Sequence, residues 1–367
     1  MAQTVTRTTQ TAGTIAPDRP PGGKLNAETD KTGARSARST HSAAAGDVLI
    51  DVRGLCQYFP IKSGLLQRTT GHVRAVDGVT FTIRRGETMG LVGESGCGKT
   101  TVGRTILHLY KPTRGSVIYD GTDLARLPSK QLRALRPQIQ LIFQDPYSSL
   151  SPRMPVGEII GEAVRQHKIV PKADYRKYIA KTMGDCGLLP HYMDRYPHEF
   201  SGGQRQRICI ARALALKPRF IVCDEPVSAL DVSIQAQIIN LMRDLQREYG
   251  LTYLFISHDL SVVEHISDVV GVMYLGSIAE IASKRDLYSD ALHPYTKALL
   301  SSAPVPDPGA KMDRQILQGD LPSPANPPPG CKFHTRCQIC VARCKEEPPP
   351  ELRDAGGGHM VACHLAR

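Results

Sequence analysis

The chain has 367 residues, of which 22% are charged and 41% are hydrophobic, and this composition excludes a chain that is disordered throughout. The length predicts about two to three domains and a sizeable core. The formal net charge of +11 favours polyanionic neighbours such as phosphates, nucleic acid or anionic lipids, although a solvated basic surface explains it equally well. The longest apolar stretches, such as residues 269–279, are too short for a membrane-spanning helix, which needs roughly 18–20 residues.

The chain begins with a polar segment. Residues 1–47 contain only four large apolar side chains, which cannot offset the entropy of ordering the segment, so we predict a flexible N-terminal tail. From residue 48 onward, short apolar runs alternate with Gly, Pro and Asp. Four runs are brief, apolar and rich in β-branched or aromatic residues, and we predict them as buried strands: residues 88–92, 139–143, 220–223 and 252–257.

Helices are predicted between these strands. Apolar residues repeat with helical spacing over residues 156–164, where Pro155 suits the first helical position. They repeat again over residues 175–183, and Gly187 suits the end of that helix. Strands that alternate with helices predict an α/β fold with a doubly wound parallel sheet. Because these two helices follow each other without a strand, we also predict an inserted helical subdomain at about residues 145–214.

The composition changes again beyond Ser302. Eleven of the 27 prolines lie at or after Pro304, and five of the ten cysteines lie in the last 37 residues. Such a stretch cannot form one regular element, so we predict an appended module that needs a staple to become ordered. The predicted division is therefore the tail, a core of residues 48–284, and a Pro- and Cys-rich C-terminal extension of residues 285–367.

The sequence GESGCGKT at residues 93–100 matches the nucleotide-binding pattern G-x4-G-K-[ST], with a predicted strand before it and a helix-compatible run after it. Its glycines let successive N–H groups point at phosphates. Lys99 is expected to reach the β- and γ-phosphates, and the Thr100 hydroxyl to bind Mg²⁺. The alternative, a chance Gly-rich turn, leaves this combination unexplained. The predicted nucleotide-binding residues of this loop are Gly93, Ser95, Gly96, Cys97, Gly98, Lys99, Thr100 and Thr101.

Two acidic residues follow the apolar run of residues 220–223. In a parallel α/β sheet, ligands lie beyond the carboxyl ends of the strands, which is where Asp224 and Glu225 are expected. Asp224 can hold Mg²⁺ through water, and Glu225 can act as the general base that polarises an attacking water. The alternative is two surface acids that begin a turn before Pro226, and the apolar run before them makes it the weaker interpretation.

Residues 200–206, FSGGQRQ, resemble the signature motif of ATP-binding-cassette (ABC) ATPases. Gln144 resembles the Q-loop glutamine of that family, residues 228–231 resemble its D-loop, and His258 resembles its switch histidine. Taken singly, the SGGQ sequence is explained equally well by a turn. His258, taken singly, is explained equally well by a histidine of the core. Five motifs in one fixed order favour the family.

The resemblance implies a P-loop NTPase (RecA-like) core with a parallel sheet, and it implies that residues 48–284 form the ATP-binding cassette. In the family, two cassettes sandwich two ATP molecules, and the signature motif faces the γ-phosphate of the opposite subunit. By this resemblance the catalytic residues are Glu225, His258 and Gln144, and the Mg²⁺ ligands are Thr100, Gln144 and Asp224. The further ATP-binding residues are Gln144, Ser201, Gly202, Gly203, Gln204, Asp224 and Asp231.

Two aromatic positions complete the resemblance. Phe59 matches the family's aromatic residue before a proline, which stacks on adenine, and Tyr58 is the alternative. The first signature residue is Phe200, where the family most often has Leu. Both are apolar and the phosphate-facing residues are intact, so we expect no loss of activity from this departure.

Two flanking segments resemble the oligopeptide/dipeptide importers of this family: residues 144–153, QDPYSSLSPR, and residues 293–300, HPYTKALL. The resemblance covers roughly residues 48–365. It implies an ATPase subunit that docks peripherally on two transmembrane permease subunits at the cytoplasmic face of the inner membrane. It also implies a second, related but non-identical ATP-binding subunit, an extracytoplasmic peptide-binding protein, and no nucleic acid. The alternatives are an ABC importer ATPase for another solute, such as nickel or sugars, and a soluble ABC ATPase acting on nucleic acid or ribosomes.

The cysteines of the extension form a pattern of their own. Cys331, Cys337, Cys344 and Cys363 resemble the four cysteines that are associated with a [4Fe-4S] cluster in many such subunits. Zinc is the second interpretation, because Cys337 and Cys340 form the tighter pair that zinc often uses. Free thiols are the third.

Overall fold

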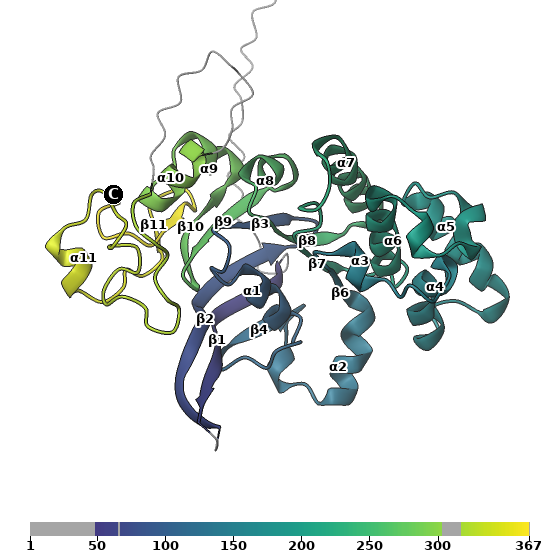
Figure 1. Cartoon of the computed structure of the whole chain (residues 1–367), viewed down its shortest axis with the longest axis horizontal. Coiled ribbons are helices and arrows are strands. Elements are labelled where there is room, and N and C mark those ends of the chain that lie inside the picture. The colour runs from purple at the N-terminus through teal and green to yellow at the C-terminus, as the bar shows by residue number, and fades with distance from the viewer. Residues whose placement is uncertain (1–47, 65–66, 303–316, 367) are drawn as a thin grey trace, which may run out of the picture. The chain divides into compact units, whose positions relative to one another are not determined.

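The computed structural model describes residues 48–64, 67–302 and 317–366, and Figure 1 shows how the elements are arranged. The predicted N-terminal tail, residues 1–47, lies outside the described residues. The strands form an eight-stranded sheet in the order β11-β12-β10-β9-β3-β8-β7-β6, and a four-stranded sheet in the order β2-β1-β4-β5.

Five neighbouring strands form the parallel core of the larger sheet, and their bounds are β9 (Val269–Tyr274), β3 (Thr88–Val92), β8 (Thr252–Ile256), β7 (Phe220–Asp224) and β6 (Ile139–Ile142). Each predicted strand is present to within one residue at its ends. The structure therefore confirms the predicted α/β fold with a parallel sheet. At one edge the sheet continues with antiparallel strands, β10 (Ser277–Ser283), β12 (Met360–Val361) and β11 (Arg353–Asp354).

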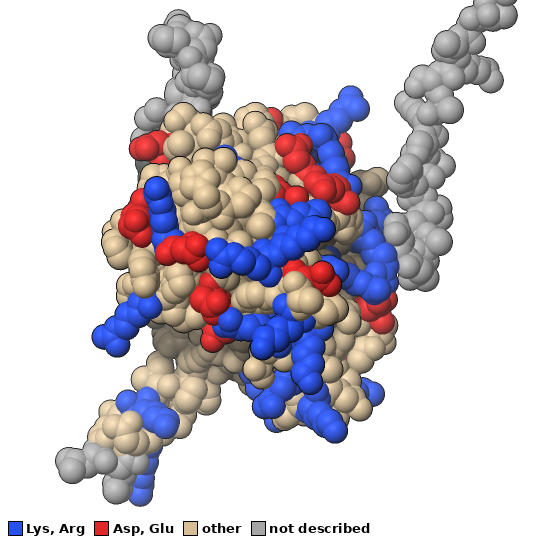
Figure 2. Space-filling view, turned by 90° about the vertical axis from the view of Figure 1, so that its right-hand side faces the viewer, with Lys and Arg blue, Asp and Glu red and all other residues tan. Residues whose placement is uncertain are grey.

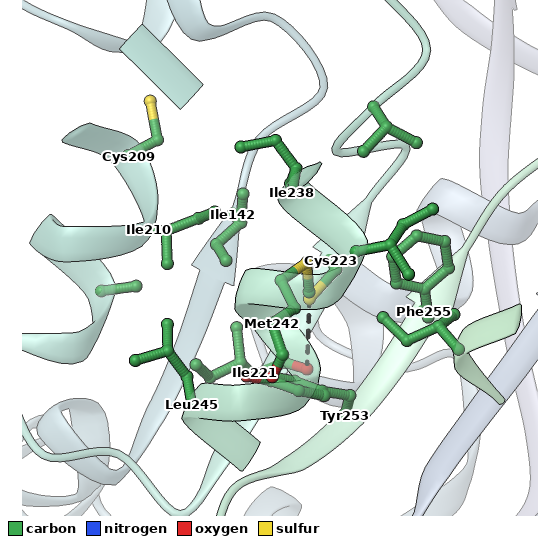
Figure 3. Packing of buried hydrophobic residues seen from close by; sticks show 14 of the residues in the cluster. Ile142, Cys209, Ile210, Ile221, Cys223, Ile238, Met242, Leu245, Tyr253 and Phe255 are labelled. Atoms are coloured by element: carbon green, nitrogen blue, oxygen red, sulfur yellow. Dashed lines mark hydrogen bonds between the residues drawn. The ribbon is translucent and has the colours of Figure 1, made fainter. Parts of the chain in front are cut away.

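The two faces of this sheet are buried by different partners. In β7, Ile221 and Cys223 pack with the helices α6 (Gly202–Leu214) and α7 (Val232–Tyr249), as Figure 3 shows around Met242 of α7. Phe220 and Val222 alternate with them and pack on the other face, against α1 (Lys99–Ile106) and the second sheet. Continuous apolar strands such as β7 follow from this burial on both faces.

The second sheet is antiparallel and was not predicted from the sequence. It contains β1 (Val48–Ser63), β2 (Arg68–Arg84), β4 (Arg114–Tyr119) and β5 (Thr122–Asp123). Register shifts interrupt the pairing of β1 with β2, and Gly54 of β1 has a φ of +53°. Such bulges break the alternation of apolar and polar residues that would otherwise mark a half-buried strand.

Between β6 and β7 the chain forms helices, and no strand is present in this fully described stretch. The helices are α3 (Pro146–Ser149), α4 (Val156–Gln166), α5 (Tyr175–Asp185) and α6, with 3-10 turns at Lys172–Asp174, Pro190–Asp194 and Pro197–Glu199. Pro155 is the N-cap of α4, one position before the predicted one. Gly187, with a φ of +70°, ends α5 as predicted, since Leu188 N–H bonds to the Met183 carbonyl across it.

The remaining helices connect or cover the sheets. They are α2 (Ser129–Leu135), α8 (Leu260–Ile266), α9 (Lys284–Ser289), α10 (Pro294–Ser302) and α11 (Ala342–Glu346), and two further 3-10 turns occupy Leu124–Arg126 and Arg136–Gln138. Within the described residues, none of the helices combines the length and the apolarity needed to cross a bilayer.

The described part of the C-terminal extension is joined to the core by several contacts. Val361 of β12 pairs with Glu280 of β10. The carboxylate of Glu280 is fully buried and lies 2.6 Å from Nε2 of His359. Phe333 packs edge-on against Tyr274 of β9. The described extension is therefore held by strand pairing with the core sheet and by aromatic packing. The sequence had predicted that a cross-link within the extension would order it.

Charged side chains of both signs cover the face that carries α4 and α5. Figure 2 shows this face, where basic side chains cover more of the surface than acidic ones and acidic ones lie among them. This mixed face fits the solvated basic surface that the composition allowed.

Candidate nucleotide site

A cavity of about 520 Å³ lies at the carboxyl ends of the parallel strands, around the loop between β3 and α1. This is the position where ligands bind in open α/β sheets. It is lined by Val73, Ala75, Ser95, Gly96, Gly98, Lys99, Thr100, Thr101, Gln144, Glu225, His258 and Pro324. The cavity thus collects most of the predicted loop residues together with all three predicted catalytic residues.

The conformation of the loop requires glycine at two positions. Gly98 has a φ of +107°, and a Cβ atom there would lie 2.0 Å from the carbonyl oxygen of Ala75. At Gly93 the φ is +150°, and a Cβ would lie 2.2 Å from the carbonyl oxygen of Met273. Gly98 is also the N-cap of α1 and supplies no side-chain cap. The first N–H groups of α1 are therefore available to an anion in the cavity.

The Lys99 side chain lies on the inner side of the phosphate-binding loop. The side chain is buried, and Nζ donates hydrogen bonds to the carbonyl oxygens of Gly93 at 2.8 Å and Glu94 at 3.0 Å. Nζ also donates to Cys97 Sγ at 3.8 Å. These acceptors carry no carboxylate charge, so the ammonium can form an ion pair with a bound phosphate. The loop backbone therefore holds Lys99 at the cavity, and its contact with the β- and γ-phosphates stays a prediction.

Thr100 and Asp224 meet beside Lys99. Thr100 Oγ1 donates to Asp224 Oδ1 at 2.6 Å, while the other carboxylate oxygen, Oδ2, is buried without a hydrogen-bond partner. Arg104 lies 3.7 Å from that oxygen. Burial raises the pKa of Asp224, which the hydrogen bond from Thr100 and the charge of Arg104 oppose. A hydroxyl oxygen beside an unpartnered carboxylate oxygen fits a Mg²⁺ ion that keeps some of its water.

Gln144, Glu225 and His258 converge although they lie on three different segments. Gln144 Nε2 donates to Glu225 Oε2 at 2.9 Å, and His258 Nδ1 lies 3.2 Å from the same oxygen. Glu225 has a φ of +46°, a conformation that costs non-glycine residues about 1–3 kcal/mol. Its N–H is held by the Ile256 carbonyl oxygen at 3.0 Å. The Glu225 carboxylate is thereby fixed at the cavity, where it can accept a proton from water.

Gln144 was also predicted as a Mg²⁺ ligand. Its side chain is exposed, and its amide nitrogen is engaged by Glu225 rather than by Thr100 or Asp224. The amide oxygen is the group of Gln144 that would face a metal. Its role as a ligand stays a prediction.

The signature motif lies apart from this cavity. Ser201 is the N-cap of α6 and accepts a hydrogen bond from Gln204 N–H at 3.4 Å, while Gln204 Oε1 accepts from Ser201 N–H at 3.1 Å. Ser201 and Gly202 are exposed, whereas Phe200 before them is buried and packs against Tyr192. None of the predicted signature residues lines the P-loop cavity.

The other predicted ATP contacts are placed as follows. Asp231 is the exposed N-cap of α7 and makes no side-chain capping bond. Phe59 does not line the cavity, but it pairs across the strands with Val73, which does. The Phe59 ring packs edge-on against Tyr110, and Tyr58 donates its hydroxyl to Asp77. The adenine-stacking role of Phe59 stays a prediction.

The four cysteines of the predicted cluster are free, and Cys344 is buried. Burial raises the pKa of Cys331 to about 11 and also raises the pKa of Cys337, so these thiols keep their protons at neutral pH. In the part of the chain that the structure describes, no three His, Cys, Asp or Glu side chains are arranged to hold a metal ion. Cys337, Cys344 and Cys363 each contribute to the raised pKa of Cys331, so the four side chains lie near one another without the arrangement of a metal site. The iron–sulfur cluster and zinc stay predictions.

Sequence reasoning missed the residues that enclose the cavity from outside the motifs. Val73 and Ala75 come from β2, and Pro324 comes from the C-terminal extension, where its carbonyl oxygen accepts a hydrogen bond from Arg74 N–H at 3.0 Å. No local pattern marks these residues, because each contributes only its position in the fold.

These features define a P-loop ATPase: a phosphate-binding loop with a buried lysine, a threonine–aspartate pair, and a glutamate carboxylate held at the same cavity. Residues 76–228 match the ABC transporter family, and residues 279–344 match the family of the oligopeptide/dipeptide transporter, C-terminal region. Over 327 residues the chain is 55% identical to the oligopeptide transport ATP-binding protein AppF of Bacillus subtilis, with 88% of this chain and 99% of that protein covered. The chain therefore belongs to the ABC transporter family, among the ATP-binding subunits of oligopeptide/dipeptide transporters.

Two solved structures resemble the cassette. One is a dimeric ATP-binding cassette in a post-hydrolysis state bound to ADP and Pi, with a TM-score of 0.58, 27% identity, and coverage of 65% of this chain and 99% of that chain. The other is cbiO1 of Clostridium perfringens, part of an ABC transporter complex, with a TM-score of 0.57, 26% identity, and coverage of 66% and 92%. ATP and Mg²⁺ are thus the cofactors that the family and the site both support.

Proposed function

We propose that this chain hydrolyses Mg-ATP to power the import of oligopeptides or dipeptides. The observation that carries the proposal is the meeting of Gln144 and His258 on the Glu225 carboxylate, at the mouth of the P-loop cavity. The peptide is supported by the relative AppF and by the matching peptide-transporter family over residues 279–344. The match of residues 279–344 to the oligopeptide/dipeptide transporter family favours peptides over nickel or sugars as the transported solute.

Each residue of the nucleotide site has its own role in ATP hydrolysis. Lys99 and the N–H groups of the loop and α1 hold the phosphates. Thr100 and Asp224 would hold Mg²⁺, which would neutralise charge on the phosphate oxygens. Glu225 accepts a proton from the attacking water, and His258 with Gln144 holds the Glu225 carboxylate and the water in line with the γ-phosphate.

The site is completed by a second ATP-binding subunit. Ser201, Gly202, Gly203 and Gln204 are turned to solvent or half-buried at the start of α6, where a phosphate held by another molecule can approach them. Asp231 would contact the same nucleotide from the start of α7. We propose that the partner is a related, non-identical chain, and that this pairing is reciprocal.

The cassette of residues 48–284, with its helical part at about residues 145–214, would act on two transmembrane permease subunits. It would sit peripherally at the cytoplasmic face of the inner membrane, and an extracytoplasmic peptide-binding protein would deliver the solute. Described residues of the extension, Pro324 and Arg336, lie beside the nucleotide site. Closure of the ATPase pair would be transmitted by Gln144, which joins the Glu225 carboxylate to the start of the helical part.

The test is purification of the complex that forms around this chain, followed by reconstitution into vesicles loaded with ATP and Mg²⁺. The proposal predicts permease subunits in the complex and ATP-dependent uptake of a labelled tripeptide or dipeptide. The same complex carrying Glu225→Gln is the control and should take up none. Association with ribosomes or DNA without permeases, or uptake of nickel or sugar but no peptide, would contradict the proposal.

A further inference from the structure

Glu94, the second residue of the phosphate-binding loop, is held by a residue of the C-terminal extension. Its carboxylate accepts two hydrogen bonds from Arg336, one from Nη1 at 2.7 Å and one from Nη2 at 3.0 Å. The Arg336 side chain is only 8% exposed. This bidentate ion pair joins residues that are 242 positions apart in the chain. A bidentate contact fixes the orientation of both the guanidinium and the carboxylate.

The backbone of Glu94 connects the same extension to the catalytic lysine. Its N–H donates to the hydroxyl oxygen of Tyr295 in α10 at 2.9 Å. Its carbonyl oxygen accepts from Lys99 Nζ at 3.0 Å. A single residue, Glu94, therefore contacts both the extension and the Lys99 ammonium, so a shift of Glu94 also shifts Lys99.

Arg336 is itself held in place. Its guanidinium lies over the ring of Tyr274, 6.0 Å from the centroid. Tyr274 packs edge-on against Tyr295 at 4.7 Å and against Phe333 at 5.2 Å, and all three aromatic side chains are buried. A guanidinium stacked on a packed aromatic cluster has little freedom to follow Glu94 if the loop moves.

The charge of Glu94 gives this contact a consequence for binding. A carboxylate inside a loop that binds a triphosphate repels the ligand unless its charge is neutralised nearby. Arg336 is the cation that meets both oxygens of this carboxylate. A second contact of the extension is made by Lys332 Nζ, which donates to Asp77 Oδ2 at 2.8 Å, Ser277 Oγ at 2.6 Å and the Leu275 carbonyl oxygen at 3.2 Å. None of these three residues belongs to the loop.

We propose that Arg336 is a positioning residue for ATP binding: it neutralises Glu94 and fixes the phosphate-binding loop from the C-terminal extension. The inference rests on the proposed function in one respect, that the loop binds ATP. If Arg336 has this role, the C-terminal extension contributes a residue to ATP binding.

The test measures the dissociation constant of Mg-ATP by titration calorimetry on the purified full-length chain. Arg336→Met keeps a long apolar side chain in the aromatic cluster. It should weaken Mg-ATP binding about tenfold, because the loop residues are no longer held in position and the unpaired Glu94 carboxylate repels the phosphates. Glu94→Gln combined with Arg336→Met should return affinity to within about threefold of the wild-type chain, since it removes the unpaired charge. The matched control is Arg343→Ala, which breaks an exposed ion pair with Glu347 in the same extension and should change nothing.

The steady-state ATPase rate of this chain assembled with its partner ATPase subunit separates positioning from a general loss of structure. Arg336→Met should raise KM for ATP more than it lowers kcat, whereas partial unfolding would lower kcat at unchanged KM. Affinity equal to wild type in Arg336→Met, or a double variant as weak as Arg336→Met, would overturn the inference. Should Arg336→Met not fold, Arg336→Lys carries the same test, with a shift of about threefold expected from loss of the bidentate contact. A wild-type chain that fails to bind Mg-ATP would instead contradict the proposed function.

Discussion

The phosphate-binding loop and the signature turn are both proposed to contact phosphate, but they differ in what surrounds them in the described chain. The loop lies in a cavity where Lys99, Thr100 and Glu225 already have their partners. The signature turn at Ser201 is exposed, and its hydrogen-bonding groups are satisfied by Gln204 of the same helix start. An exposed turn of this kind fits the proposal that a second ATPase subunit supplies the nucleotide that the turn contacts.

The largest expected effect is at the cavity of the phosphate-binding loop. Glu225→Gln keeps the shape of the side chain and removes the base, so turnover should fall by about 10²–10⁴ while Mg-ATP still binds. The measurement compares steady-state hydrolysis with the dissociation constant of Mg-ATP. Glu248→Gln, an exposed position on α7, is the matched control and should leave both unchanged. Unchanged hydrolysis in Glu225→Gln would contradict the role of the base.

The signature turn is tested by Ser201→Asp. Aspartate is as good an N-cap as serine, so α6 should remain intact, but its negative charge would face the phosphate held by the partner. Hydrolysis by the assembled ATPase pair should fall by about 10²–10³, as it does when a donor to transition-state charge is lost. Binding of Mg-ATP to the isolated chain should not change. Weakened binding in the isolated chain would show that the turn and the loop of one molecule share a ligand.

A smaller effect is expected at the metal position. Burial raises the pKa of Asp224 above its ordinary 3.8, and Mg²⁺ binds the charged form. As pH falls through this raised pKa, Mg²⁺ affinity should decline at a higher pH than an exposed aspartate would require. Asp224→Asn should lower Mg²⁺ affinity about 10–100-fold and remove this pH dependence. Asp244→Asn, exposed on α7, is the control, and an unaltered pH profile in Asp224→Asn would argue against the assignment.

The last effect concerns the stability of the fold behind the loop rather than catalysis. His293 is fully buried, its Nδ1 accepts the Tyr295 N–H at 3.0 Å, and burial lowers its pKa to about 4 from an ordinary 6.5. The unfolded chain therefore binds the proton more readily, so stability present above pH 6.5 is lost as pH falls towards 4. The loss should be on the order of 2–3 kcal/mol in the free energy of unfolding.

His293→Asn retains an acceptor for Tyr295 and should flatten that pH dependence in urea titrations. His72→Asn, an exposed position on β2, should leave the pH dependence as it is. A slope between pH 6.5 and 4 that survives in His293→Asn would assign the acid sensitivity to another group.

The parallel strands and the ATPase motifs could be predicted because both are local patterns. An apolar run buried on two faces, such as β7, is recognisable without knowing its neighbours, and so is a glycine loop followed by Lys99 and Thr100. The β1–β2 sheet escaped prediction because bulges such as the one near Gly54 interrupt its alternation. The cysteine pattern predicted a metal staple, whereas the described extension is held by strand pairing, aromatic packing and ion pairs.

The enclosure of the site could not be predicted because it depends on contacts between distant segments. Arg336 and Glu94 are charged residues that a sequence alone places on a solvated surface, and only the fold brings them together. The position of Pro324 at the cavity likewise follows from the path of the extension along β2.

The most direct test is a structure of the assembled importer trapped with Mg-ATP by Glu225→Gln. The account predicts that Ser201 N–H and hydroxyl groups contact the γ-phosphate of a nucleotide held by the loop of the other ATPase subunit, while Lys99 holds its own. A closed, nucleotide-loaded pair in which Ser201 still faces solvent would contradict it.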